Sequence, residues 1–175
     1  MEKIKFLILI VLYKLSPEQS DTLKSLSQCK LAKDYARILI RDNSPKAYDT
    51  EQRRTMEEML DGFAFEYRHN RRNEYLSTLY NQTIQELQEN EYLILLDHDS
   101  QFDLNFLEET KKSISAHPEI DLFLPLIYCD NQLGPYKLIG VENGDIIDLS
   151  PHKVLDRKAF MGKALLILQA TGEKG

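Results

Sequence analysis

The sequence has few of the residues that mark disordered, disulfide-linked or zinc-binding proteins. Its 175 residues include only 7 glycines, 6 prolines and 2 cysteines. So few glycines and prolines argue against a long disordered region. Cys29 and Cys129 lie far apart and form no CxxC pair, so the sequence indicates neither a zinc site nor a disulfide framework. This cysteine usage fits a reducing, cytoplasmic compartment.

An excess of basic charge is also lacking. The formal net charge is −6, whereas nucleic-acid-binding domains usually carry a basic surplus. We therefore do not expect nucleic acid as the main partner. A local basic cluster at residues 68–72 has two interpretations, a solvated surface or a site for a small anionic ligand.

The sequence shows no apolar run of the roughly 20 residues that a transmembrane helix needs. The run at residues 6–12 follows two lysines and in this respect imitates a signal peptide. Tyr13 and Lys14 come next instead of a small-residue cleavage site, so we expect a buried strand. The expected location is cytoplasmic, with peripheral attachment at the inner face of the membrane as an alternative.

Apolar runs alternate with segments of helical periodicity along most of the chain. This alternation is typical of βαβ units and predicts an α/β fold with a mostly parallel, Rossmann-like sheet flanked by helices. The length favours a single domain over residues 1–175. Strands are predicted at residues 5–13, 36–41, 63–68, 92–96 and 121–128, with short ones at 136–140 and 145–149. Helices are predicted from residue 16, over 50–60 and 74–90, and after residue 100 as far as about 117. Residues 159–171 are apolar without a clear period.

Polar residues follow several of these strands where each one ends. Tyr13 follows the first strand, Asp42 the second, the basic cluster the third, and Asp97 and Asp99 the fourth. In an open parallel sheet, ligands bind beyond the carboxyl ends of the strands. We therefore expect these residues to meet at one edge.

Asp97 and Asp99 stand two residues apart, a spacing that puts side chains on the same side of an extended backbone. Two close carboxylates repel each other, and a divalent cation removes that conflict. Mg²⁺ and Mn²⁺ prefer oxygen ligands and commonly bind a substrate's phosphates as well. The alternatives are a solvated loop, or Asp99 or Ser100 capping the next helix. His98 is either a third ligand or faces the opposite side.

Four segments together resemble glycosyltransferase family 2, and within it the bacterial rhamnosyltransferase-like group. They are Val11-Leu12-Tyr13, Ile40-Arg41-Asp42-Asn43-Ser44, the Asn-rich entry Asn70-Arg71-Arg72-Asn73 to the long helix, and Leu95-Leu96-Asp97-His98-Asp99-Ser100. The resemblance covers residues 4–128. It departs from the family at Lys14, where Asn is usual, and at Tyr75, where Gly is usual.

The resemblance implies a GT-A fold, a nucleoside-diphosphate sugar donor and Mn²⁺ or Mg²⁺. It implies that Leu12 and Tyr13 contact the base or ribose, that Asp42 contacts the base, and that Arg72 and Asn73 lie near the nucleotide. It also implies that Asp97 faces the ribose or donor sugar at the metal site and that Asp99 binds the metal. Each residue also has a simpler interpretation: a core aromatic for Tyr13, a turn for Asp42 and a helix cap for Asn73.

The main functional hypothesis is an inverting glycosyltransferase of polysaccharide or cell-surface glycan synthesis. It would use a UDP- or dTDP-sugar and a glycan or lipid-linked acceptor. The family's acceptor half, which supplies the catalytic base, has no match here, so no base is assigned and that half is expected to be missing. The alternative is a non-catalytic or truncated nucleotide-sugar-binding module.

A phosphatase of the haloacid dehalogenase type, with Asp97 as nucleophile, is a third possibility. It is disfavoured because Ser100-Gln101 follows the acids instead of Gly-Thr, and because the acids follow the fourth strand instead of the first.

Overall fold

The structure is a computed structural model that describes residues 4–123, 125, 138–142 and 145–149. The chain divides into two compact units, residues 1–120 and residues 121–175. The second unit holds an antiparallel pair of strands, β5 (Leu138–Glu142) and β6 (Asp145–Leu149). The first unit carries all of the predicted site residues.

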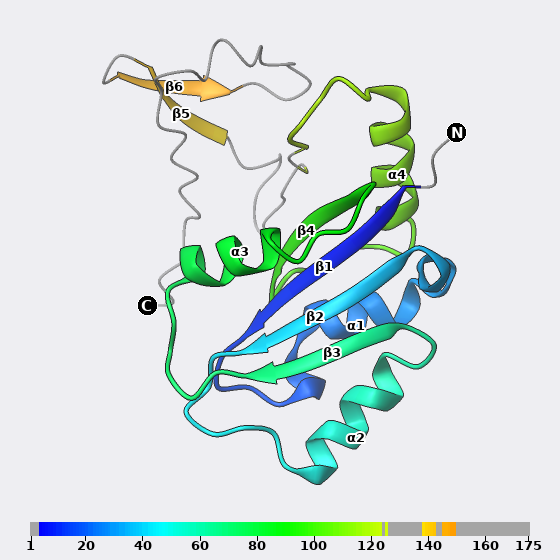
Figure 1. The fold of residues 1–175 in the computed structure, drawn as a ribbon, viewed down its shortest axis with the longest axis vertical. Coiled ribbons are helices and arrows are strands. Elements are labelled where there is room, and N and C mark those ends of the chain that lie inside the picture. Colours follow the sequence, from blue (N-terminus) through cyan, green and yellow to red (C-terminus); the bar gives the residue numbers. More distant parts are fainter. Residues whose placement is uncertain (1–3, 124, 126–137, 143–144, 150–175) are drawn as a thin grey trace. The chain divides into compact units, whose positions relative to one another are not determined.

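A four-stranded parallel sheet forms the centre of the first unit (Figure 1). Its strands are β1 (Lys5–Leu12), β2 (Ala36–Asp42), β3 (Ala64–His69) and β4 (Glu91–Asp97). Their order across the sheet is β3-β2-β1-β4. The expected α/β architecture is therefore confirmed, because parallel neighbours require the crossover connections that the helices supply.

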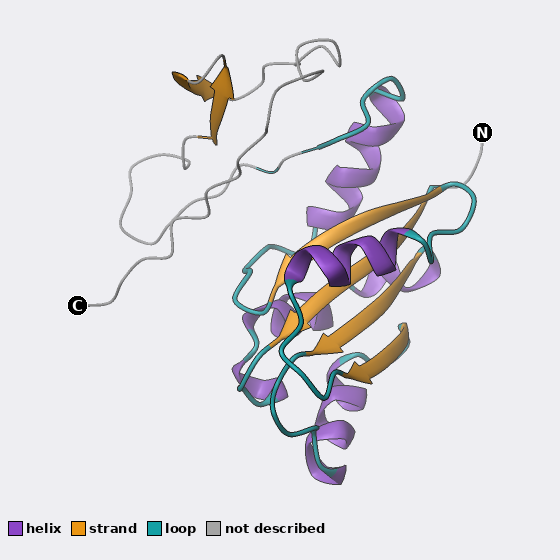
Figure 2. Ribbon diagram, turned by 60° about the vertical axis from the view of Figure 1, so that its left-hand side comes forward, coloured by secondary structure: helices purple, strands orange, loops and turns teal. Residues whose placement is uncertain are grey.

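Helices cover both faces of this sheet (Figure 2). One face carries α3 (Leu76–Ile84), and the other carries α1 (Asp21–Gln28), α2 (Thr50–Met59) and α4 (Phe106–Ala116). Two short 3₁₀ helices, η1 (Pro17–Gln19) and η2 (Lys30–Asp34), complete the unit. Within the described residues, no helix combines the length and the apolar character needed to cross a membrane.

Strand β1 lies at the centre of the core because it is apolar on both faces. Leu7 and Leu9 have no exposed surface and pack with Leu79 of α3. Phe6, on the opposite face, is equally buried and meets the ring of Tyr35 edge-on. A strand covered on both sides should read as a continuous apolar run, as this one does.

Strands β1 to β4 agree closely with those predicted, but the longest predicted helix is much shorter. Helix α3 ends at Ile84, although the periodicity predicts a helix to residue 90. The carbonyl of Glu86 accepts a hydrogen bond from Arg37 Nη2 at 2.9 Å, and the carboxylate of Glu86 pairs with Arg68 at 2.6 Å. These contacts with the sheet take the place of further helical turns.

The helix predicted from residue 16 is divided in two. Gln19 Oε1 accepts from the Ser16 amide as a capping box would require, but only the short helix η1 follows. Ser20 then adopts an extended conformation and caps α1. Leu23 and Leu26 of α1 are fully buried, as their spacing predicts.

Part of the predicted structure lies outside the described residues. Of the predicted strand at 121–128, the described residues 121–123 and 125 are not in a strand, and the others are not described. Residues 159–171 also lie outside the described part. The short strands predicted at 136–140 and 145–149 correspond to β5 and β6.

Lys14, just after β1, has a φ of 53°, and left-handed backbone costs most residues about 1–2 kcal/mol. Asn tolerates this region better. We therefore expect Lys14→Asn to raise the free energy of unfolding in urea by about 0.5–1 kcal/mol. Lys46→Asn is the matched control, since Lys46 is also exposed but is not left-handed. Equal effects of the two substitutions would contradict this explanation.

Candidate functional site at the carboxyl edge of the sheet

The carboxyl ends of the four strands meet at one edge. Leu12, Asp42 and His69 are register partners across β1, β2 and β3, and Asp97 of β4 pairs with Val11. The strand order changes direction between β1 and β4, and open α/β sheets bind ligands at such a point. The fold therefore brings the predicted residues of β1, β2 and β4 to the expected place.

The side chain of Asp42 lies inside the turn that follows β2. It has no exposed surface, and its Oδ1 accepts from the Ser44 amide at 2.9 Å. Its Oδ2 accepts from the Tyr67 hydroxyl, which itself accepts from the Tyr48 amide at 2.9 Å. Burial, then the hydrogen bond to Asp42, raise the pKa of Tyr67, so this phenol remains a donor. Asp42 thus organises the turn, and its contact with a base stays a prediction.

A chain of amides fixes the loop between β3 and α3. Asn70 Nδ2 donates to Asn43 Oδ1 at 2.6 Å, and Asn43 Nδ2 donates to the Glu74 carbonyl at 3.0 Å. Arg41, which is buried, donates from Nη2 to Asn70 Oδ1 at 3.1 Å. Both ends of the loop are therefore attached to β2.

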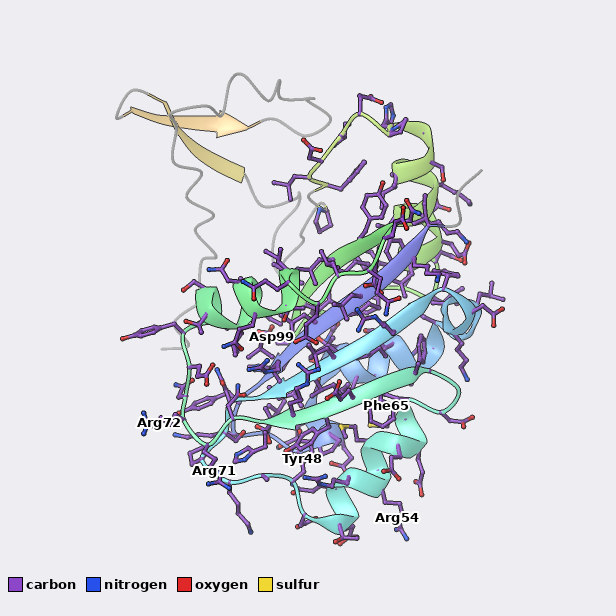
Figure 3. All side chains as sticks on the ribbon, viewed as in Figure 1. Tyr48, Arg54, Phe65, Arg71, Arg72 and Asp99 are labelled. Carbon is purple, nitrogen blue, oxygen red and sulfur yellow. The ribbon has the colours of Figure 1, made fainter. Side chains whose placement is uncertain are left out.

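The middle of this loop carries the predicted nucleotide ligands Arg72 and Asn73. Both are exposed, and Figure 3 shows Arg72 on the loop after β3. Within the described residues, no hydrogen bond or ion pair joins either of them to Asp97 or Asp99. Helix α3 has Tyr75 as its N-cap, so the interpretation of Asn73 as that cap is wrong. Tyr75 itself is 84% exposed.

The two predicted residues at the end of β1 differ in accessibility. Leu12 has no exposed surface, whereas Tyr13 is 37% exposed. The ammonium of Lys14 lies 4.9 Å from the centre of the Tyr13 ring. Tyr13 is thus the member of this pair that offers a surface to a ligand.

The acidic turn after β4 is held through its backbone by the start of α1. The Thr22 hydroxyl donates to the Asp97 carbonyl and accepts from the Ser100 amide at 3.0 Å. Ser20 Oγ donates to the His98 carbonyl at 2.9 Å. Backbone groups that would otherwise need water or a side chain of the turn are satisfied from α1.

The carboxylates of this turn remain without protein partners in the described part of the chain. Asp97 is half-buried and Asp99 is exposed beside the end of β4 (Figure 3). Asp97 pairs in register with Val11, which packs in the same cluster as Leu79, so Asp97 lies on the α3 side of the sheet. Burial, then the negative charge of Asp97, raise the pKa of Tyr80 on that side. Helix α4 has Asn105 as its N-cap, so the interpretation of Asp99 or Ser100 as that cap is wrong.

The carboxylates of Asp97 and Asp99 are suitable ligands for a hard cation, but they form a small set of donors. Carboxylate oxygens are the ligands that Mg²⁺ and Mn²⁺ prefer. Among the described residues there is no group of three or more His, Cys, Asp or Glu that could hold a metal, so His98 does not complete such a group with the two acids. The turn therefore offers two carboxylates as protein ligands.

Two open hollows lie near these segments. One, of about 530 Å³, lies between the loops after β1 and β2, and its lining includes Lys14, Ser44 and Tyr48. The other, of about 460 Å³, lies between α1 and the segment after the acidic turn, and its lining includes Lys24 and Phe102. Neither is lined by Asp97 or Asp99. The candidate site is therefore located by the strand register and the backbone contacts of the acidic turn, and not by either hollow.

Sequence reasoning missed the polar face of α1. Thr22, Ser25 and Cys29 are all buried and follow helical spacing. Ser25 Oγ accepts from the Phe102 amide at 3.2 Å, and Cys29 Sγ lies 3.8 Å from the Asp103 carbonyl. The sequence pattern that indicates this face is a repeat of small polar residues at positions i, i+3 and i+7, beside the apolar face of Leu23 and Leu26.

A parallel sheet with helices on both faces and a polar edge at the change of strand order defines a Rossmann-like class of fold. Residues 8–160 match the family described as glycosyl transferase family 2, and the chain belongs to that family. Its fold is accordingly the GT-A fold. The sequence matches no curated protein.

Crystal structures of S. aureus TarS share this fold. The 1–349 segment aligns with a TM-score of 0.58 at 17% identity, over 78% of this chain and 41% of that chain. A second structure of TarS gives 0.58 at 18%, over 79% and 24%. The 1–349 segment in complex with UDP gives 0.57 at 18%, over 77% and 39%. The chain thus spans less than half the length of each.

We predict that Tyr67→Phe destabilises the protein, because it leaves a buried Asp42 oxygen and the Tyr48 amide without their partner. The expected loss is about 1–3 kcal/mol in the free energy of unfolding, measured in urea. The control is Tyr92→Phe, since the half-buried Tyr92 hydroxyl has no hydrogen bond among the described residues. If Tyr92→Phe costs as much, the Asp42 network does not stabilise this edge.

Proposed function

We propose that this protein transfers a sugar from a nucleoside diphosphate to a hydroxyl group of an acceptor, with inversion at the anomeric carbon. The bond from that carbon to the diphosphate oxygen breaks, and a bond to the acceptor oxygen forms on the opposite face. A general base takes the acceptor's proton. The products are the glycoside and the nucleoside diphosphate.

One observation carries the proposal. Asp97 and Asp99 stand at the change of strand order, where their turn takes its hydrogen bonds from Ser20 and Thr22. Their carboxylates are not used to hold the turn together. Asp97 is the last residue of β4 and Asp99 lies in the turn that follows, so the extended backbone expected for the pair ends at Asp97. Both side chains are unpaired among the described residues, and a bound cation would neutralise their charge. Membership of glycosyl transferase family 2 supports the same conclusion.

We propose Mn²⁺ or Mg²⁺ as that cation, with Asp97 and Asp99 as its protein ligands. Mg²⁺ is commonly held by one or two carboxylates together with substrate phosphates, which matches the small donor set found here. When bound, the cation would neutralise charge that develops on the diphosphate leaving group. Asp97, on the α3 side of the sheet, would also face the ribose or donor sugar.

The nucleotide would be held by residues of the other strand ends. Tyr13 offers an exposed ring to the base or ribose beside Leu12, and Asp42 would contact the base if the turn around it opens. Arg72 and Asn73 are exposed on a loop attached to β2 and would approach the nucleotide. We propose a UDP- or dTDP-sugar as donor, and the TarS complex with UDP is consistent with the first of these.

We propose a glycan or lipid-linked acceptor, in polysaccharide or cell-surface glycan synthesis, with rhamnosyl transfer as one specificity. Nucleic acid is not proposed as a partner. The proposed location is the cytoplasm or the inner face of the membrane, and the buried free thiol of Cys29 is compatible with it.

The decisive experiment is the substitution Asp99→Asn, which keeps the size of the side chain and removes its charge. We expect calorimetry to show UDP binding that Mn²⁺ strengthens in the unmodified protein. This strengthening should fall at least about tenfold in the variant, because a charged ligand of the cation is lost. Asp61→Asn is the control, since Asp61 is exposed and precedes the opposite end of β3.

Three other results would change the conclusion. Binding of UDP, dTDP and GDP that does not depend on Mn²⁺ would refute the metal site. Metal-dependent binding without sugar transfer or donor hydrolysis would identify a nucleotide-sugar-binding module instead. Phosphatase activity that Asp97→Asn abolishes would favour the haloacid dehalogenase mechanism.

A further inference from the structure

A row of small polar side chains, which runs along α1 from its N-cap to its C-cap, faces the acidic turn and the residues after it. We name this row, Ser20, Thr22, Ser25 and Cys29, the polar seam of α1. Every member is buried. Burying polar groups costs free energy unless they are hydrogen-bonded. The seam therefore favours the one conformation of residues 97–103 that satisfies it.

Thr22 is the central member of the seam because its hydroxyl contacts both ends of the turn. It donates to the carbonyl of Asp97 and accepts from the amide of Ser100. The Thr22 amide donates to the His98 carbonyl at 3.3 Å, and Ser20 Oγ donates to the same carbonyl at 2.9 Å. Backbone groups along the whole turn are thus fixed from residues more than seventy positions away in the sequence.

In this arrangement, α1 holds the backbone of the turn, and the carboxylates of the turn are left for a ligand. A short acidic turn commonly uses its own carboxylates to accept from nearby backbone amides. Here Thr22 takes the Ser100 amide instead. In the described part of the chain, the carboxylates of Asp97 and Asp99 accept no hydrogen bond. Their oxygens remain free for a ligand while the backbone that carries them is held.

We propose that Thr22, assisted by Ser20, is a positioning residue for metal-dependent binding of the donor. Its hydroxyl sets the backbone of the acidic turn so that Asp97 and Asp99 serve one cation. This inference rests on the proposed function. Thr22 itself contacts neither the cation nor the nucleotide.

The test compares Thr22→Val, which removes the hydroxyl, with Thr22→Ser, which keeps it. The matched control is Thr83→Val, because Thr83 is equally buried and its hydroxyl donates to the Leu79 carbonyl within α3. The probes are UDP with Mn²⁺ and UDP without metal, both measured by calorimetry. We expect Thr22→Val to weaken the binding of UDP with Mn²⁺ by about tenfold and to leave metal-free binding unchanged. Thr22→Ser and Thr83→Val should each stay within about twofold.

Amide hydrogen exchange without any ligand tests the contact independently of the function. Thr22→Val should speed exchange at the Ser100 amide, which loses its 3.0 Å hydrogen bond to Thr22 and keeps only the longer one, of 3.4 Å, to the Asp97 carbonyl. If exchange over residues 97–103 is unchanged, the inference is overturned whatever the binding data show. If exchange rises but binding of UDP with Mn²⁺ weakens no more than in Thr83→Val, the positioning role is overturned.

The failure of the proposed function has a different signature. If the unmodified protein does not bind UDP with Mn²⁺, the proposed function fails and the positioning role for a donor fails with it. The exchange data then still decide whether Thr22 holds the turn. If Thr22→Val does not fold, Ser20→Gly replaces it, because Gly is tolerated at an N-cap and removes the hydroxyl that bonds the His98 carbonyl. The same loss of metal-dependent binding is expected, and unchanged binding would overturn the proposal.

Discussion

The hydrogen bonds between the Thr22 hydroxyl and the backbone of the acidic turn are the contact on which the rest of the site depends. They join the start of α1 to the end of β4. A buried hydroxyl stabilises the fold most where it satisfies both a donor and an acceptor, because each buried group left unsatisfied would lower the free energy of unfolding by about 1–3 kcal/mol. Because Thr22 satisfies the Asp97 carbonyl and the Ser100 amide, the carboxylates of Asp97 and Asp99 are left to the solvent or to a ligand.

Two other acids on the α3 side of the sheet are paired with arginines. Glu91 receives a hydrogen bond from Arg37 at 2.7 Å, and Glu86 receives one from Arg68 at 2.6 Å. Burial opposes ionisation of Glu91, but the Arg37 contact and the hydrogen bond from the Gln88 amide together outweigh it, so the pKa of this carboxyl lies below its usual value. Asp97 lies on this same side without such a partner among the described residues. That contrast within one face supports the proposal of a cation at the acidic turn.

Much of the fold could be predicted because each strand carries its own signal. The apolar run of β1 and the polar residues that end β2 and β4 gave the strands and the edge where a ligand would bind. The length of α3 could not be predicted, because Arg37 of β2 and Arg68 of β3 form hydrogen bonds with Glu86. These contacts between distant segments take the place of further helical turns. The interruption of the helix at Ser20 could not be predicted either, because Ser16 and Ser20 are both residues that favour the N-cap position.

The parallel α/β sheet, and the places of Asp42, Asp97 and Asp99 after its strands, follow from the amino-acid sequence, because periodicity and turn chemistry are local properties. The contacts of each acid follow from the packing of distant segments. It buried Asp42 beneath Tyr67 and left Asp97 and Asp99 unpaired in the described region. A carboxylate's partners come from segments distant in sequence, and Tyr67 and Thr22 reach their hydrogen-bond partners only when the strands and α1 have packed together.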